Sequence, residues 1–522
     1  MKYKEIFFWI TVILFAFLIS IITRQTNATP SQLLDANQNL FFSKNILVSG
    51  DLSYVNPYNE KYSQIFGFRT TFIDGGGLNL PATHLGYIYV LSIFRLALLD
   101  EIFFITFFLL VLSAAYVKKL ATLLFDAKTS YIAVIGFLFF SSVIYWSTAY
   151  INDVAALFFF IVAMYYFFRY LESERQIEGI LFALFYFVAV FIRFSYLPVL
   201  VSFVIAFVFV RKPNKKALFV GLFLFVNILL LFIFNFFNYN FFLGPVSNQV
   251  LRRLSPNIIS KDSLEGVSLV SNFFVFSNSE VFINNIKNYL LGLQIVFFFV
   301  PSLITVFKGL QKKNRNLLPF SLFFVTTVLI LASLYLGKEW SGYSSTFLIN
   351  SMYTRYLLPM YLLFIIAGSY SLRKYLSRFS KSFAVVFLVG FIIMFMAINF
   401  QLVSPQLNYN SGLDFERKFS IDVINNTNGD SVIFTTYFDK YLFPTRQTAI
   451  YTTFEKDTRK ENTANLIKDL LADGKEVYFI DENYLKDYDE FTLKDDYFPY
   501  FTKAGLEPKN VSFRLYKIEL TK

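Results

Sequence analysis

Two acidic and two basic side chains lie where a catalytic site at a membrane surface could use them. Asp35 follows the first apolar stretch, in LLDANQNLFFSKNILVSGD, and Asp153 begins a later one, in YINDVAALFFF. Arg193 lies in FIRFSYLPVL and Arg355 opens TRYLLPMYLLF. A carboxylate can act as a general base, and an arginine can hold a phosphate through two hydrogen bonds. These residues predict a site for a phosphate-bearing substrate.

Each of these four residues also has a purely structural interpretation. Asp35 could cap the short helix that the spacing of NLFFSKNILVSGD predicts, with Gly50 as its stop. Asp153 could be a favourable charge at the start of a helix. Arg193 and Arg355 could extend their guanidinium groups to lipid headgroups. At the level of sequence both interpretations stay open.

Further polar residues could complete the predicted site. His84, the only histidine of the chain, and Lys338 could contact a bound phosphate, although His84 could equally make a structural hydrogen bond. Asp35 and Asp153 together could bind a divalent cation such as Mg²⁺ or Mn²⁺ through oxygen ligands. The run Gly75-Gly76-Gly77 predicts a flexible turn first and a loop for ligand approach second.

Composition excludes several other chemistries. The chain has no cysteine, so it can form neither a disulfide framework nor a thiolate metal site nor a cysteine nucleophile. A single histidine also argues against a histidine-rich metal cluster and a Ser-His-Asp triad. The chemistry must therefore come from carboxylates, arginines, lysines and tyrosines.

The elements that must position these residues are membrane spans. Of the 522 residues, 56% are hydrophobic, and the mean hydropathy is +0.52. Runs such as LFLFVNILLLFIFNFFNYNFF (222–242) carry no charge and are long enough to cross a bilayer. The sequence predicts a polytopic α-helical membrane protein of about eleven spans, located in the plasma membrane.

Charge gives the orientation of the spans. Residues 1–404 hold 16 acidic and 31 basic residues, a net charge of +15, and residues 405–522 hold 20 acidic and 16 basic residues, a net charge of −4. Clusters of lysine and arginine between apolar stretches mark cytoplasmic loops, which explains the basic charge without a nucleic-acid partner. We predict a cytoplasmic N-terminus on an uncleaved anchor, residues 6–22. This orientation requires residues 85–117, which contain two apolar halves, to cross the membrane an odd number of times. One of the two halves must therefore be short or interfacial.

Two polar regions are then expected on the outer side. The first loop, residues 24–83, is long enough to indicate a functional role. Residues 405–522 predict a small extracytoplasmic α/β domain, with strands at 431–437, 476–480 and 511–520 and a helix that ends at Gly474. No glycine-rich phosphate loop follows a strand. The predicted domains are thus 1–404, in the membrane, and 405–522.

The order of these motifs resembles the GT-C superfamily of integral-membrane glycosyltransferases, which includes protein O-mannosyltransferases and lipid A aminoarabinose transferases. The resemblance rests on the acid in the first loop, the second span LPATHLGYIYVLSIFRL, the acid heading YINDVAALFFF, the arginine of FIRFSYLPVL and the late RYLLPMYLLF. The order of spans and motifs is similar over residues 1–400. This resemblance implies transfer of a sugar from a polyprenyl-phosphate donor to a glycan, lipid or protein acceptor on the outer face.

The resemblance also implies roles for single residues. Asp35 would be the base that deprotonates the acceptor hydroxyl, and Asp153 would match a second acid that binds metal in some members. Arg355 would hold the donor phosphate, with support from Arg193. The first loop has a single acid at 35 instead of the Asp-Glu pair of the best-known O-mannosyltransferases, which leaves metal dependence open.

Three other functions fit parts of the pattern. An envelope polysaccharide polymerase or ligase also uses lipid-linked sugars, but more often has its long loop late in the chain. A transporter or flippase favours inverted repeats and ionisable residues at mid-membrane, whereas the acids here lie at membrane edges. A non-catalytic membrane scaffold would tolerate loss of Asp35.

Overall fold

The fold is described from a computed structural model of the chain. It describes residues 2–27, 34–56, 58–59, 71–73, 78–81, 85–98, 103–148, 152–211, 214–239, 279–311, 317–337, 346–411, 414–435, 438–443, 445–450, 457–482 and 493–521.

The chain divides into two compact units. The first comprises Met1–Gln25 and His84–Asn408, and the second comprises Thr26–Thr83 and Tyr409–Lys522. The second unit therefore combines the first loop with the C-terminal segment, whereas the division expected from sequence kept that loop with residues 1–404. Each unit is described by itself.

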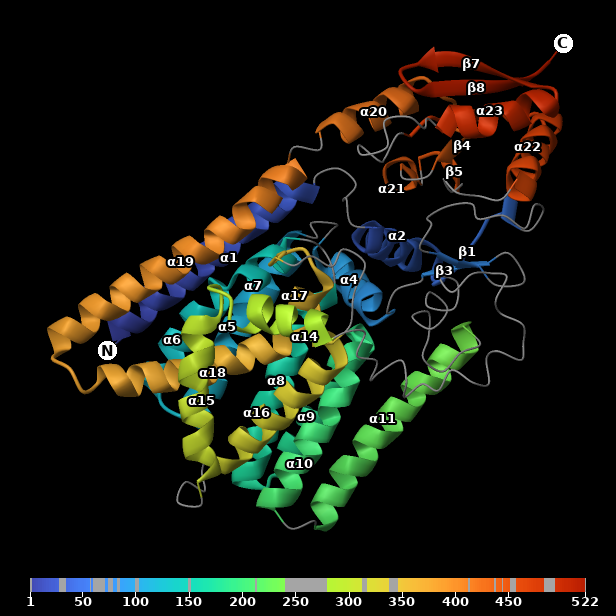
Figure 1. Ribbon diagram of the computed structural model, residues 1–522. Coiled ribbons are helices and arrows are strands. Elements are labelled where there is room, and N and C mark those ends of the chain that lie inside the picture. The colour runs from blue at the N-terminus through green and yellow to red at the C-terminus, as the bar shows by residue number, and fades with distance from the viewer. Residues whose placement is uncertain are drawn as a thin grey trace. The chain divides into compact units, whose positions relative to one another are not determined.

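The first unit is helical (Figure 1). Its α-helices are α1 (Lys2–Asn27), α4 (Leu85–Leu98), α5 (Phe103–Leu124), α6 (Ala127–Leu138), α7 (Ser141–Ser147), α8 (Asn152–Ser173), α9 (Gln176–Ile192), α10 (Leu200–Val210), α11 (Lys215–Tyr239), α14 (Ser279–Asn285), α15 (Val296–Leu310), α16 (Leu318–Leu331), α17 (Met352–Tyr356), α18 (Leu358–Leu376) and α19 (Lys381–Ser411). A 3₁₀ helix, η1 (Phe194–Val199), and two π-helical turns, η3 (Ile286–Leu290) and η4 (Ala332–Leu336), complete it.

Several of these helices can cross a membrane. Within the described residues, six are long and apolar enough, and the bent pair α6 and α7, which meet at 55°, could form a seventh span. Shorter apolar helices lie at 85–97, 176–192, 194–210 and 296–310. The protein is therefore an integral membrane protein. The predicted total of about eleven spans is larger than the six or seven candidate spans of full length and stays a prediction. In the ambiguous region 85–117, α4 is the short half and α5 is of spanning length, as expected.

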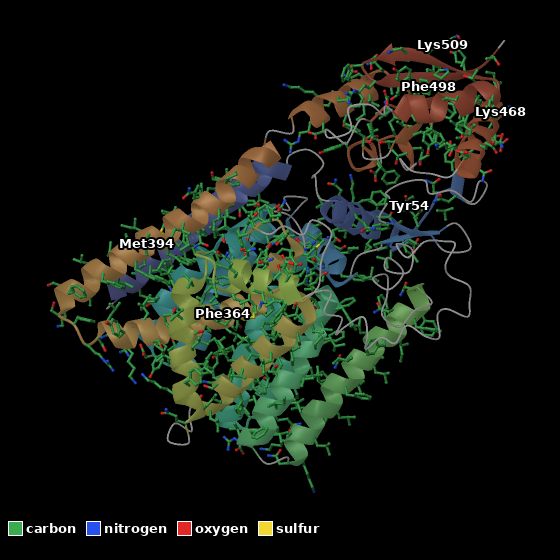
Figure 2. The ribbon with its side chains drawn as sticks, in the orientation of Figure 1. Tyr54, Phe364, Met394, Lys468, Phe498 and Lys509 are labelled. Carbon is green, nitrogen blue, oxygen red and sulfur yellow. The ribbon has the colours of Figure 1, made fainter. Side chains whose placement is uncertain are left out.

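Burial separates the inner helices from the outer ones. The apolar window of α8 is 72% buried, whereas those of α11 and α19 are 22% and 17% buried. Helix α18 is also central, and its Phe364, labelled in Figure 2, is fully buried. Apolar side chains that face outward are expected of helices surrounded by lipid. The charged residues of the site come from the ends of the inner helices.

The C-terminal part of the second unit is a five-stranded sheet with helices on both faces. Its elements are α20 (Asp414–Asn425), β4 (Val432–Thr435), α21 (Asp439–Leu442), β5 (Gln447–Ile450), α22 (Asp457–Ala472), β6 (Val477–Ile480), α23 (Leu493–Lys503), β7 (Leu506–Ser512) and β8 (Leu515–Leu520). The strand order is β5-β4-β6-β8-β7, with β5, β4 and β6 parallel. This confirms a small C-terminal α/β sheet.

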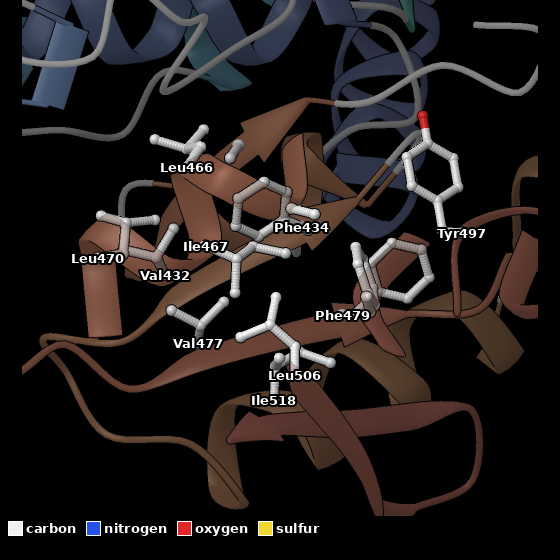
Figure 3. Close-up of a cluster of buried hydrophobic side chains, with 13 residues drawn as sticks. Val432, Phe434, Leu466, Ile467, Leu470, Val477, Phe479, Tyr497, Leu506 and Ile518 are labelled. Atoms are coloured by element: carbon white, nitrogen blue, oxygen red, sulfur yellow. The ribbon is translucent and has the colours of Figure 1, made fainter. Parts of the chain in front are cut away.

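Alternation of side chains gives this sheet two apolar cores. Val432, Phe434, Val477 and Phe479 point to one core together with residues of α22 and α23 (Figure 3). Ile433, Tyr478 and Ile480 point to the other, together with residues of α20 and α21. Strands buried on both faces have apolar residues at nearly every position, which is why 431–437 and 476–480 could be predicted from sequence.

The predicted strand over 511–520 is wrong in its extent. Residues 513–514 form the turn of a β7–β8 hairpin, and Arg514 has a φ of 59°. The predicted stop at Gly474 is confirmed, because α22 ends at Ala472 and Gly474 has a φ of 75°, a region that glycine adopts without a steric penalty.

The described part of the first loop contains one helix and a small sheet. Helix α2 (Leu34–Ser49) ends at Gly50, which has a φ of 79° and donates its N–H to the carbonyl of Ile46 at 3.0 Å, so the predicted helix stop is confirmed. Strands β1 (Tyr54–Val55), β2 (Thr71–Ile73) and β3 (Leu78–Pro81) pair antiparallel in the order β1-β3-β2.

Candidate active site

Three helix ends bring the candidate residues of the first unit together. Asp153 lies in the first turn of α8, Arg193 follows the last residue of α9, and Arg355 lies in α17. Helices α8 and α9 pack against each other. At the other end of this pair, Arg169 donates two hydrogen bonds to Oε1 of Glu178, at 3.1 and 2.9 Å. The two helices are joined by the short turn 174–175 and pack along their length, which places Arg193, after the end of α9, beside Asp153, at the start of α8.

Asp153 is fully buried and forms ion pairs with both arginines. Its Oδ1 pairs with Nη1 of Arg193, and its Oδ2 accepts a hydrogen bond from Nε of Arg355 at 3.0 Å. The side chains of Arg193 and Arg355 are 4% and 10% exposed. We call these three residues the Asp153 cluster. With both arginines charged, its formal charge is +1.

Polar neighbours fix the orientation of Arg193. Its Nη1 donates to Oδ1 of Asn152 at 3.2 Å, and its Nε donates to Oγ of Ser195 at 3.1 Å. Asn152 in turn donates from Nδ2 to the carbonyl of Ile192 at 3.1 Å. The backbone N–H of Arg193 still donates to the carbonyl of Ala189 at 2.9 Å, so α9 ends at the cluster.

Aromatic rings cover both guanidinium groups. The guanidinium carbon of Arg193 lies 4.6 Å from the ring centroid of Tyr356, and that of Arg355 lies 5.1 Å from Trp146. Nε1 of Trp146 donates to Oγ1 of the buried Thr354 at 3.1 Å, which fixes the ring. A cation over an aromatic face is attracted by the ring quadrupole, more strongly away from water. The arginines are therefore held in place before any ligand binds.

This geometry decides between the structural interpretations given above. Arg193 and Arg355 are buried in ion pairs, so they do not extend to lipid headgroups. A buried carboxylate needs compensation by opposite charge and hydrogen bonds, and Asp153 receives both. Two arginines around one carboxylate leave an excess of positive charge, an arrangement suited to an anion such as a phosphate.

The residues around Asp153 do not fit a divalent cation. Both carboxylate oxygens face guanidinium groups, whose positive charge would repel a metal ion at the same oxygens. Within the part of the chain that the structure describes, no group of three or more His, Asp or Glu side chains could hold a metal. Asp153 is therefore not suited to hold a metal ion.

Asp35 lies in the first turn of α2, in the second unit, and its side chain lies outside the described residues. His84, Lys338 and Gly75–Gly77 also lie outside them. The predicted roles of these residues stay predictions.

Sequence reasoning missed several residues that support the arginines. Asn152 and Tyr356 are the chain neighbours of Asp153 and Arg355, so adjacency was an available signal. Trp146 had no such signal, since only the packing of α7 near α17 brings it to Arg355.

Comparisons with known proteins extend this description. The sequence matches no protein-family profile and no curated protein. Among solved structures, the oligosaccharyltransferase of Archaeoglobus fulgidus matches with a TM-score of 0.59 and 12% identity, over 92% of this chain and 70% of that one. ArnT from Cupriavidus metallidurans bound to undecaprenyl phosphate matches with a TM-score of 0.56 and 11% identity, over 99% and 98%.

A third structure agrees with these two. The arabinofuranosyltransferase AftD from Mycobacteria matches with a TM-score of 0.50 and 11% identity, over 98% of this chain and 41% of that one. All three neighbours are glycosyltransferases of the GT-C type. The protein therefore has a GT-C-like fold, which confirms the resemblance identified from its motifs.

Proposed function

We propose that the protein is a glycosyltransferase that moves a sugar from a polyprenyl-phosphate donor to an acceptor hydroxyl at the outer membrane surface. The observation that carries this proposal is the Asp153 cluster: two buried arginines held on one carboxylate, in a GT-C-like fold. The acceptor is a glycan, a lipid or a protein.

Support for the donor comes from the cluster and from one neighbour. ArnT from Cupriavidus metallidurans was solved with undecaprenyl phosphate, and the same class of lipid would suit this chain. Its polyprenyl tail stays in the bilayer while its phosphate meets Arg193 and Arg355. Charge-assisted hydrogen bonds from arginine to phosphate are about twice as strong as neutral ones. The arginines would stabilise the negative charge that develops on the departing phosphate.

Transfer then needs one base. The acceptor oxygen attacks the anomeric carbon, the bond from that carbon to the phosphate oxygen breaks, and its electron pair goes to the phosphate. The proton of the acceptor hydroxyl goes to the carboxylate of Asp35. Since phosphate is a stable leaving group, a general acid is not needed. Attack from the side opposite the phosphate inverts the anomeric carbon.

The charge pattern supports an outer location of the site. Lys118, Arg211 and Arg373 belong to the basic clusters that mark cytoplasmic loops. Helix α8 is 22 residues long, about the length needed to cross the hydrocarbon core, and Asp153 lies at its first turn. With a cytoplasmic N-terminus, this end of α8, the first loop and the C-terminal domain face outward.

The test is sugar release from radiolabelled polyprenyl-phosphate sugars by the purified protein. We expect turnover by the wild type and a loss of roughly 100-fold or more in folded Asp35→Asn, because a general base contributes about 10²–10⁴-fold. Asp51→Asn is the matched control, an exposed acid of the same loop that should keep activity. Full turnover by Asp35→Asn would refute the role of Asp35, and an inactive wild type would refute the function.

A further inference from the structure

The first loop and the C-terminal domain share an aromatic cluster in the second unit. Phe443, between α21 and β5, lies 5.1 Å from Phe41 of α2 and 5.7 Å from Tyr54 of β1, measured between ring centroids. Phe41 and Tyr54 are themselves 5.2 Å apart. Phe443 is 5% exposed, and Phe42, the chain neighbour of Phe41 in α2, is fully buried. Tyr54 is labelled in Figure 2. One side chain of the domain thus contacts both α2 and β1 of the loop.

Two more contacts join the same parts. Nδ2 of Asn56 donates to Oε1 of Gln447 at 3.0 Å, and Asn56 is 1% exposed. Tyr58 packs against the apolar core formed with α22 and α23, and Nζ of Lys475 lies 5.9 Å from its ring centroid. Gln447 begins β5, one of the two edge strands of the five-stranded sheet. The loop therefore contacts the domain at this edge strand and at one of its cores.

Helix α2 is tied to the segment that makes these contacts. Nδ2 of Asn45, in α2, donates to the carbonyls of Asp51 and Ser53 at 2.9 and 3.0 Å. Burial raises the pKa of the Tyr54 phenol well above its usual range, so Tyr54 stays neutral in the aromatic cluster. Because α2 and β1 are joined in this way, a contact that fixes β1 also fixes the helix that carries Asp35.

We propose that the C-terminal domain is a positioning element for catalysis: Phe443 and Gln447 hold α2 and thereby orient Asp35. This inference rests on the proposed function for the role of Asp35, while the docking of the loop stands on the contacts alone. Phe443 and Gln447 are positioning residues, since they act through α2 and contact no substrate. On this account the C-terminal domain contributes to catalysis by positioning α2.

The test compares Phe443→Ala with Phe513→Ala in the full chain. Phe513 lies in the β7–β8 turn, is 60% exposed and has its ring 6.4 Å from that of Phe419 in α20, so its loss removes the same ring from another part of the domain. We expect faster amide hydrogen exchange across 34–58 in Phe443→Ala only. We also expect kcat to fall about 10- to 100-fold with little change in KM for the donor, because small displacements of a catalytic group cost rates of that order.

A cross-link supplies the rescue. The chain has no cysteine, so Asn56→Cys and Gln447→Cys can be joined by a short bifunctional maleimide without side reactions. In the Phe443→Ala background, cross-linking should restore most of kcat. In the Asn56→Cys, Gln447→Cys protein that keeps Phe443, it should recover the turnover that loss of the Asn56–Gln447 hydrogen bond costs.

Three results would overturn the inference. Unchanged hydrogen exchange across 34–58 in Phe443→Ala would refute the docking, whatever the activity. A cross-link that abolishes turnover in the protein that keeps Phe443 would refute the docked arrangement as the active one. Loss through KM alone would refute positioning of the base. If the wild type turns over no donor, the proposed function and the catalytic part of this inference fail together, and hydrogen exchange still decides the docking.

Discussion

At the scale of residues, the central feature is a carboxylate whose charge is needed by its neighbours. Asp153 is fully buried and faces Arg193 and Arg355, each nearly buried. Removing one partner of a buried ion pair leaves uncompensated charge and costs about 3–5 kcal/mol. Asp153 therefore holds the two arginines in place, and the arginines make its burial possible.

This arrangement predicts strong coupling between Asp153 and Arg355. Asp153→Asn should destabilise the protein by about 3–5 kcal/mol, since it leaves two guanidinium groups without their anion. In the double variant Asp153→Asn, Arg355→Gln, the loss should be smaller than the sum of the single losses by about 1–3 kcal/mol. Thermal or denaturant unfolding of the wild type, the two single variants and the double variant, all in one detergent, measures these losses of stability. Additive losses would contradict a shared ion pair.

The same residues predict an activity that does not depend on a metal. The guanidinium groups of Arg193 and Arg355 face both oxygens of Asp153, so this carboxylate is not suited to bind Mg²⁺ or Mn²⁺. The metal site predicted at Asp35 and Asp153 therefore lacks one of its two ligands. Turnover should stay within about twofold after treatment with EDTA, because a buried arginine already supplies the positive charge. Loss on chelation and recovery with Mg²⁺ or Mn²⁺ would contradict this.

Sequence identified the members of the cluster but not their pairing. Acids and arginines at the ends of apolar stretches could be recognised because charge is rare there. Asp153 and Arg355 are 202 positions apart, and no local pattern tells which helix ends meet. The contacts of Trp146 and Tyr356 with the two guanidinium groups likewise result from packing, which no local pattern predicts.

At the scale of elements, the end of α9 depends on its contact with α4. A Cβ added to Gly86 would lie 2.6 Å from the backbone N of Ile192 and 2.7 Å from the carbonyl oxygen of Phe191. These atoms are backbone, so they cannot turn aside as a flexible side chain would. The absence of a side chain at 86 thus lets α4 approach the residue that precedes Arg193.

Gly86→Ala should therefore lower activity through α9. The added methyl group must displace the end of α9, and Arg193 moves with it; we expect turnover to fall about 10- to 100-fold. Gly390→Ala in α19, where nothing lies within 4 Å of the added Cβ, is the control. It should keep activity and be neutral or stabilise by up to about 1 kcal/mol, from helix propensity. Equal activity of the two variants would contradict this role of α4.

The sheet of the C-terminal domain carries a pH-dependent contact. Nζ of Lys517, on β8, donates to Oε1 of Glu476 at 2.8 Å, and Asn428 donates to its Oε2 at 2.7 Å. Lys517 first, and then Asn428 and Tyr478, hold the pKa of Glu476 below its ordinary value. A lowered folded pKa gives stability that is present above the ordinary pKa of glutamate and is lost as pH falls through the folded one.

The domain should therefore open more readily in acid. Hydrogen exchange of β6 and β8 in the full chain should accelerate as pH falls below the usual range of glutamate, beyond the intrinsic change in exchange rate. Glu476→Gln should remove part of that acceleration, whereas Glu519→Gln, in an exposed pair with Lys509, should not. Identical pH profiles of wild type and Glu476→Gln would contradict this assignment.

Regular elements were the easiest to predict. Helix stops at Gly50 and Gly474 and strands β4 and β6 follow from residue type and apolar runs. Strand β5 was missed because its four residues, QTAI, have no clear alternation. The β7–β8 turn was missed because Arg514 takes a positive φ that few residues other than glycine adopt, so no turn residue marks it.

At the scale of the whole molecule, the sequence predicted the membrane class and the C-terminal α/β sheet but not the grouping of the first loop with that domain. Asn56 and Gln447 are 391 positions apart. A contact over that separation leaves no local pattern in the sequence. The GT-C-like fold was accessible from the order of motifs, and three of the residues in those motifs, Asp153, Arg193 and Arg355, lie at helix ends that the fold brings together.

The measurement that tests the central claim most directly is the affinity of the purified protein for undecaprenyl phosphate. Wild type should bind, and Arg193→Gln and Arg355→Gln, checked for folding by thermal unfolding, should each raise Kd by about 10- to 100-fold. That range follows from losing a charge-assisted hydrogen bond of about 1.5–3 kcal/mol. Arg373→Gln, an arginine paired with Asp126 away from the cluster, is the control and should bind as wild type does. Equal affinity of all four proteins would contradict a phosphate site at Arg193 and Arg355.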